Sequence, residues 1–180
     1  MRRELWRRIA LLVIASGLAG AAAPVSEYQV KAVFLFNFAQ FVEWPTSAFP
    51  HPNAPFVIGV LGQDPFGGNL DEVVRGESVN KRPLAVARFH DVAEVRDCQI
   101  LFISATELPH LEEILAALKG RSILTVTDAN DPGERGVMIA LVTQDSKIRL
   151  RIDLQAAKAG NLTISSKLLR PAEIVGAARS

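Results

Sequence analysis

The chain has 180 residues, of which 20 are Lys or Arg and 19 are Asp or Glu, so its net charge is +1. This near balance gives no electrostatic reason to expect binding to nucleic acid or to anionic lipid. An intrachain disulfide is excluded because Cys98 is the only cysteine. We expect this thiol to be buried and inert, with a redox sensor or an intermolecular bridge as the alternatives.

The first 22 residues have the organisation of a secretory signal peptide. Four arginines precede an unbroken apolar run over residues 9–15, and small residues follow. A basic start, a short apolar centre and an Ala-x-Ala ending such as Ala19-Gly20-Ala21 are the three parts of such a leader. We therefore expect cleavage after Ala21 or Ala22 and a single domain over residues 23–180. An uncleaved membrane anchor is the alternative, although the apolar stretch is shorter than the roughly 20 residues that a bilayer span needs.

A helix is predicted at the start of the mature chain. Ser26-Glu27-Tyr28-Gln29 has the form of a capping box and opens a helix that runs to about Val42, and Pro45 stops it. The polar residues of this helix fall in one narrow strip, while its apolar residues spread over a wider arc than one core contact requires. Such a helix is either covered on two sides by its own domain or presses part of its surface against another molecule.

The middle of the chain alternates between apolar strands and helices. Strands are predicted over residues 56–61, 84–89, 99–103 and 123–127, and helices over residues 69–74 and 107–118, with Gly120 as the stop of the second helix. Strands that are apolar throughout and alternate with helices are typical of a largely parallel sheet covered on both faces. The fold class is therefore α/β.

A C-terminal antiparallel hairpin is expected to complete this mixed sheet. The strands over residues 137–142 and 147–152 are joined by a turn too short for a parallel crossover. In the second strand Lys147, Arg149 and Arg151 alternate with apolar residues, which indicates a solvated basic face, or alternatively an anion site. A short helix over residues 154–159, a stop at Gly160 and the segment 162–169 follow.

The catalytic and metal-binding motifs that can be sought in this sequence are incomplete. The three histidines are far apart, and the loop over residues 128–133 lacks the carboxylate that a calcium loop needs at its twelfth position. The glycines at 59, 62, 67 and 68 form no complete nucleotide-binding string, so at most a small anion could bind at the helix that follows them. We therefore expect no enzymatic activity, no cofactor and no metal site.

Three segments carry a resemblance to a known family. They are Tyr28–Phe38 followed by Phe41-Val42-Glu43-Trp44-Pro45, then residues 58–67, and finally residues 159–169. In this order, with residues 98–104 and 136–139 between them, they cover nearly the whole mature chain. The sequence resembles the YfiR family of periplasmic regulators. Two departures stand out: Cys98 has no partner, although family members often carry paired cysteines, and Pro171 stands where an apolar residue is common.

The resemblance implies a function that composition and periodicity do not address. It implies a periplasmic inhibitor that binds the periplasmic region of an inner-membrane diguanylate cyclase, and that is itself sequestered by an outer-membrane lipoprotein. A homodimer is implied as well. Two rival interpretations are a periplasmic small-ligand sensor that works with a histidine kinase, and an uncharacterised hydrolase.

We expect the partner-binding surface to combine the first helix with the segment after Gly160. Leu168 and Leu169 are adjacent, so at helical spacing they point about 100° apart and cannot both face one core. An apolar residue rimmed by polar ones can serve as a small contact patch. A C-terminal segment that only closes the core is the alternative. The residues expected in this surface are Phe34, Phe38, Phe41, Ile164, Lys167, Leu168 and Leu169.

Overall fold

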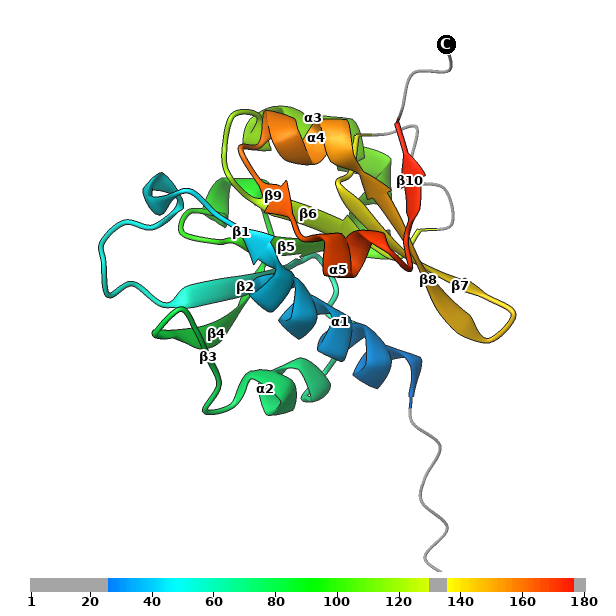
Figure 1. The fold of residues 1–180 in the computed structure, drawn as a ribbon, viewed down its shortest axis with the longest axis horizontal. Helices are drawn as coiled ribbons and strands as arrows, with labels where there is room; N and C mark the ends of the chain where they lie inside the picture. The colour runs from blue at the N-terminus through cyan, green and yellow to red at the C-terminus, as the bar shows by residue number, and fades with distance from the viewer. Residues whose placement is uncertain (1–25, 130–135, 177–180) are drawn as a thin grey trace, which may run out of the picture.

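The computed structural model describes residues 26–129 and 136–176 and has an eight-stranded sheet at its centre (Figure 1). The predicted signal peptide lies outside the described residues. The strands of this sheet are β2 (Phe56–Leu61), β3 (Ser78–Val79), β4 (Arg82–Phe89), β5 (Ile100–Ile103), β6 (Leu124–Thr127), β7 (Ile139–Gln144), β8 (Lys147–Asp153) and β10 (Glu173–Val175).

The strand order in the sheet is β10-β8-β7-β6-β5-β2-β4-β3. Strands β4, β2, β5, β6 and β7 are parallel neighbours, whereas β8 runs antiparallel to β7 and forms the predicted hairpin with it. Strand β10 then pairs parallel to β8, and β3 pairs antiparallel to β4. The prediction of a mixed, largely parallel sheet is confirmed.

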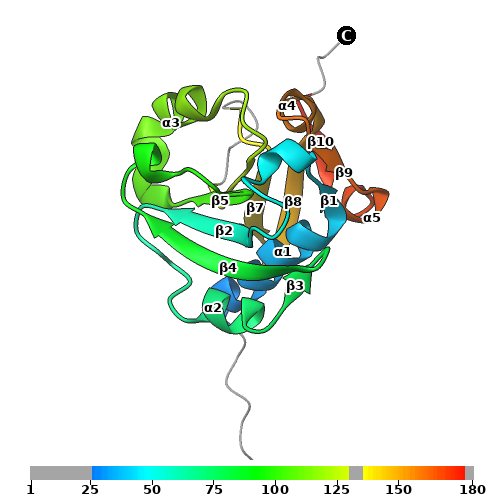
Figure 2. The ribbon, with the colours of Figure 1, turned by 90° about the vertical axis from the view of Figure 1, so that its left-hand side faces the viewer.

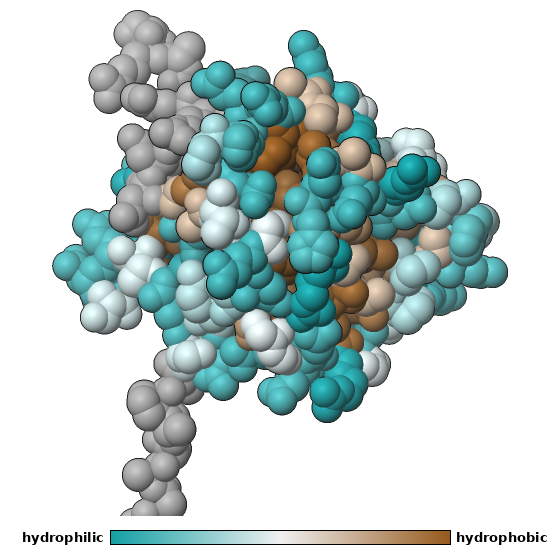
Figure 3. Space-filling model, turned by 180° about the vertical axis from the view of Figure 1, so that it is seen from behind, coloured by the Kyte–Doolittle hydropathy of each residue, from teal (hydrophilic) through white to brown (hydrophobic). Residues whose placement is uncertain are grey.

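Helices cover both faces of the sheet. Successive residues of its central strands face opposite sides, and since these residues are apolar, both faces need to be covered. Ile100 and Phe102 of β5 lie in one apolar core, and Leu101 and Ile103 lie in another. Figure 2 shows α1 and α5 on one side of the sheet and α3 on the other. The face that α3 covers is seen from outside in Figure 3, where mostly hydrophilic residues surround patches of hydrophobic residues. The helices are α1 (Glu27–Phe41), α2 (Asn69–Val74), α3 (Leu111–Leu118), α4 (Leu154–Ala159) and α5 (Ser166–Leu169).

The first helix begins with the predicted capping box. The Ser26 hydroxyl accepts a hydrogen bond from the Gln29 N–H at 3.2 Å, and the Gln29 side-chain oxygen accepts one from the Ser26 N–H at 2.7 Å. The helix ends one residue earlier than expected, because the chain becomes extended at Val42 and forms the short strand β1 (Val42–Glu43). This strand pairs antiparallel with β9 (Thr163–Ile164) in a separate two-stranded sheet.

Other differences from the prediction are local. The segment over residues 105–110, expected to be helical from 107, is a 3-10 helix with Pro109 inside it, and the α-helix begins only at Leu111. Proline lacks the N–H that a helix interior needs, which accounts for the later start. The predicted strand at 137–142 begins at Ile139 and extends to Gln144. Strand β10 has no counterpart in the prediction, and Pro171 lies in the turn that precedes it.

Candidate functional site

The structure brings together the two segments from which a partner-binding surface was expected. The pairing of β1 with β9 joins the end of α1 to the C-terminal segment, and the Ser165 N–H donates to the Phe41 carbonyl at 2.9 Å. The Ser165 hydroxyl then caps α5 by accepting from the Lys167 N–H. The Lys167 ammonium lies 5.4 Å from the centre of the Phe41 ring, within the range of a cation–π contact. Helices α1 and α5 therefore form one continuous surface, which is turned toward the viewer in Figure 1.

Three of the seven residues predicted for this surface are instead buried in the domain's own core. The side chains of Phe38, Ile164 and Leu168 are 0%, 8% and 6% exposed. Phe38 lies on the side of α1 that packs on the sheet, and Leu168 fills the space beneath α5. These three side chains are covered by the domain itself and are not available to a partner in this conformation.

The other four predicted residues reach the surface. Lys167 is exposed, while Phe34, Phe41 and Leu169 are half-buried. Leu168 and Leu169 thus differ in the way that their adjacency predicted: Leu168 lies in the core, and Leu169 is partly exposed at the surface.

The structure adds two residues that the prediction omitted. Val30 and Val33 of α1 are 37% and 44% exposed, which is high for large apolar side chains. They line a groove of about 490 Å³ between α1 and α2, with Glu72 and Val73 on its other side. The unusually wide apolar arc of the helix was the only signal for them in the sequence. We call the set Val30, Val33, Phe34, Phe41, Lys167 and Leu169 the α1–α5 surface.

A polar cluster lies near the beginning of α1 and was not predicted. Lys31 is 2% exposed, and its ammonium lies 2.8 Å from Asp128 Oδ2 and 2.5 Å from Glu27 Oε1. The Tyr28 hydroxyl donates to the same Asp128 oxygen at 2.9 Å. Burial, and then this hydrogen bond to a carboxylate, raise the pKa of Tyr28 to about 12. The hydrogen bond from Lys31 holds the pKa of Glu27 below its usual value.

Cys98 has the surroundings of an unreactive thiol. It is 3% exposed, and Sγ donates to the Ile100 carbonyl at 2.9 Å. Burial raises its pKa to about 12, so the reactive thiolate is scarce near neutral pH. The prediction of a buried cysteine is confirmed. The thiol lies close to Gly59, and the Phe89 ring packs near the same glycine.

The anion sites that the sequence left open gain no support. Helix α2, which follows the glycines at 67 and 68, has only six residues and carries Asp71 and Glu72 in its first turn. Carboxylates at that end disfavour a bound anion. On β8, Arg151 pairs with Glu173 of β10 at 3.0 Å, and Lys147 and Arg149 are exposed to solvent.

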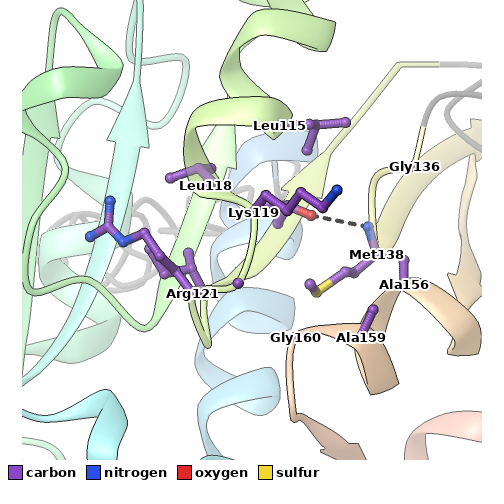
Figure 4. A pocket seen from close by; sticks show the side chains of 12 residues that line it. Leu115, Leu118, Lys119, Arg121, Gly136, Met138, Ala156, Ala159 and Gly160 are labelled. Atoms are coloured by element: carbon purple, nitrogen blue, oxygen red, sulfur yellow. Dashed lines mark hydrogen bonds between the residues drawn. The ribbon is translucent and has the colours of Figure 1, made fainter.

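An apolar hollow of about 310 Å³ lies between α3 and α4. Leu115 and Leu118 form one wall, and Met138 with Ala156 forms the opposite wall (Figure 4). The dashed line in the figure is the hydrogen bond from the Met138 N–H to the Thr125 hydroxyl. The longer polar side chains among its lining residues are those of Lys119, Arg121 and Thr125. In the part of the chain that the structure describes, no three His, Cys, Asp or Glu side chains gather as they would around a metal ion.

Comparison with known proteins identifies the family. A family model described as YfiR/HmsC-like matches residues 28–173. The chain belongs to the YfiR/HmsC-like family. This match spans the α1–α5 surface and, apart from Glu27, the polar cluster, and it confirms the resemblance found in the sequence.

The YfiR/HmsC-like family is associated with regulation of diguanylate cyclases from the periplasm. A search among curated proteins finds no match to this chain. Within residues 26–129 and 136–176, none of the helices is long and apolar enough to cross a membrane.

Proposed function

We propose that this protein is a non-enzymatic periplasmic regulator that binds the periplasmic region of an inner-membrane diguanylate cyclase and inhibits it. The family match over residues 28–173 is the observation that carries this proposal. The leader over residues 1–22, with its basic, apolar and small-residue parts, supports export to the periplasm. Cellular cyclic-di-GMP is the quantity that such an inhibitor would control.

The cyclase would bind to the α1–α5 surface. Apolar side chains that are exposed in a free domain and surrounded by polar groups are typical of binding patches. Val33 lies on the exposed side of α1, and Leu169 lies half-buried beside Lys167. Binding energy in such patches is concentrated in a few apolar anchors, so single charged substitutions should disrupt the contact.

The experiment compares Val33→Asp and Leu169→Asp with Ala116→Asp in a strain that lacks the chromosomal copy. Ala116 is exposed on α3, on the opposite face of the sheet, and receives the same substitution. Deletion should raise cyclic-di-GMP, and the wild type and Ala116→Asp should lower it again. Val33→Asp and Leu169→Asp should fail to lower it while the purified proteins melt within a few degrees of wild type.

Leu168→Asp tests whether Leu168 is a core residue and not a contact residue. A charge at this core position should cost several kcal/mol of stability and lower the melting temperature strongly. If Val33→Asp and Leu169→Asp both restore repression as well as wild type does, the α1–α5 surface is not the cyclase-binding surface. If deletion leaves cyclic-di-GMP unchanged, the proposal of cyclase inhibition itself fails.

An outer-membrane lipoprotein as a second partner and a homodimer are further parts of this proposal. Light scattering of the purified protein would establish the oligomeric state. A small-ligand sensor that works with a histidine kinase is the alternative function. It would be favoured if deletion changed the phosphorylation of a kinase encoded beside this gene and left cyclic-di-GMP unaltered.

A further inference from the structure

We propose that a crevice at the carboxyl ends of the parallel strands binds a small molecule that carries a protonated amine. The crevice has a volume of about 220 Å³. Its polar lining comes from Tyr28, Gln63, Asp64, Ser104, Thr106 and Asp128, and we call it the switch-point crevice. It is separate from the α1–α5 surface, and the proposal does not depend on cyclase binding.

The position of the crevice follows from the strand order. The chain passes from β2 to β4 on one side of β2, then returns to form β5 on the other side, and continues to β6. The connections therefore leave β2 and β5 in opposite directions. The loops that follow these two strands diverge, and a crevice can form between them beyond the strand ends. In open α/β sheets ligands bind outside the carboxyl ends of the strands at such a reversal. Gln63 and Asp64 follow β2, Ser104 follows β5, and Asp128 follows β6.

One acceptor in the crevice has unused hydrogen-bonding capacity. The Asp128 side chain is only 9% exposed. Lys31 and Tyr28 both donate to its Oδ2 atom, and no described residue donates to Oδ1. None of the fully buried side-chain oxygens of the described residues lacks a partner, so Oδ1 is not fully covered by protein and can be reached by a further donor. A ligand ammonium or hydroxyl group in the crevice would supply one.

The charge around the crevice favours a cationic ligand over a neutral or anionic one. Lys31 is shared by the carboxylates of Glu27 and Asp128. Arg88 is shared in the same way by Asp64, at 2.8 Å, and Asp71, at 2.5 Å. Arg75 is a further cation near Asp71, and Glu107 is a further carboxylate that accepts a hydrogen bond from the Thr106 hydroxyl. Three cations thus face five carboxylates around the crevice, which leaves an excess of two negative charges. An ammonium group is attracted by that excess, and a carboxylate or phosphate is repelled.

The remaining lining sets the size and shape of the ligand. Pro65, Ala105 and the Tyr28 ring supply apolar wall next to the polar groups. A volume of about 220 Å³ corresponds to about seven water molecules at the roughly 30 Å³ that each occupies in the liquid. A primary amine with a short aliphatic chain fits both the volume and the mixed lining.

The test is an NMR titration of the full mature protein with three probes of one size. These are butylammonium, butanol and butyrate, which differ in charge at one end. Butylammonium should shift the amide signals of Gln63, Thr106 and Asp128 saturably, and the other two probes should not. Equal binding of butanol would overturn the charge argument. Shifts that do not saturate, or that occur only elsewhere, would overturn the site.

A matched pair of variants tests the site without disturbing the fold. Gln63 is exposed at the crevice, and its side chain makes no hydrogen bond with the described residues. Gln63→Lys should weaken butylammonium binding by about fivefold and Gln63→Glu should strengthen it by about as much, with unchanged melting temperatures. Identical affinity in both variants would contradict the proposal. Asp128→Asn should abolish saturable binding.

Discussion

Lys31 and Asp128 form a buried ion pair across 97 positions of sequence, with Nζ 2.8 Å from Oδ2. The pair connects the first turns of α1 to the carboxyl end of β6, and the Tyr28 hydroxyl strengthens the connection by donating to the same oxygen. Removing one member of a buried pair leaves the other charge without compensation, which is why such pairs are sensitive to single substitution.

We predict that Lys31→Met lowers the free energy of unfolding by about 3 kcal/mol. Asp128→Asn should also destabilise, and the double variant should lose less than the sum of the two, since neither charge is then left alone. Urea unfolding near neutral pH measures all three. Lys147→Met, an exposed lysine on β8, is the control and should change stability by less than about 0.5 kcal/mol. Strictly additive losses would mean that the two side chains are not coupled.

Acid should destabilise the protein through Glu27 and Asp71. Hydrogen bonds from Lys31 and Arg88 hold the pKa values of these carboxyls below their usual 4.5 and 3.8. The unfolded chain therefore binds more protons, so the stability from these groups is present above those values and is lost as the pH falls below them. Melting temperatures from about pH 6 to about pH 3 should show this fall.

The variants Glu27→Gln and Asp71→Asn should each flatten this pH dependence. Glu112→Gln is the control, because Glu112 is exposed on α3 and forms no ion pair with the described residues. A curve for Glu27→Gln with the wild-type slope would show that the Lys31 contact does not persist in solution.

The thiol of Cys98 should react slowly in the native protein. With its pKa raised to about 12 and its side chain buried, the thiolate is both scarce and inaccessible. Labelling by a disulfide reagent should be at least about tenfold faster in denaturant. Cys98→Ser should cost about 1 kcal/mol and leave repression intact. A disulfide-linked dimer formed by oxidation of the folded protein would contradict this interpretation.

Gly59→Ala should destabilise because β2 approaches its neighbours closely at this point. A Cβ atom there would lie 2.7 Å from Phe89 Cε2 and 2.8 Å from Cys98 Sγ. Overpacking of this kind costs about 1–3 kcal/mol. Gly68→Ala is the matched control, since a Cβ at that residue would meet nothing within 4 Å. Equal stability of the two variants would show that the core between β2 and α3 yields more easily than the geometry indicates.

Many elements could be predicted because their signals are local. Strand β2, α2 and α4 have the predicted bounds, since an apolar run, a helical period or a stop residue is contained within a few positions. Strand β10 was missed for the opposite reason. Its three residues include Glu173, and they become a strand only because β8 offers an edge on which to pair.

The candidate site could be predicted only in part. The sequence identified the two segments of the α1–α5 surface and the fact that Leu168 and Leu169 face different ways. It did not separate the buried Phe38 from the half-buried Phe34 and Phe41, because all three lie in one apolar arc of the helix.

The sequence by itself determined the α/β class, the order of most elements and membership of the family, because these follow from periodicity, caps and motifs within short segments. Only the tertiary structure decided that Lys31 is buried while Val33 is exposed. A lysine is normally found at the surface and a valine in the core. Here Asp128, far along the chain, neutralises the lysine, and neither α2 nor α5 covers the valine. Burial depends on which neighbours arrive from distant parts of the chain, and that information is absent from any local pattern.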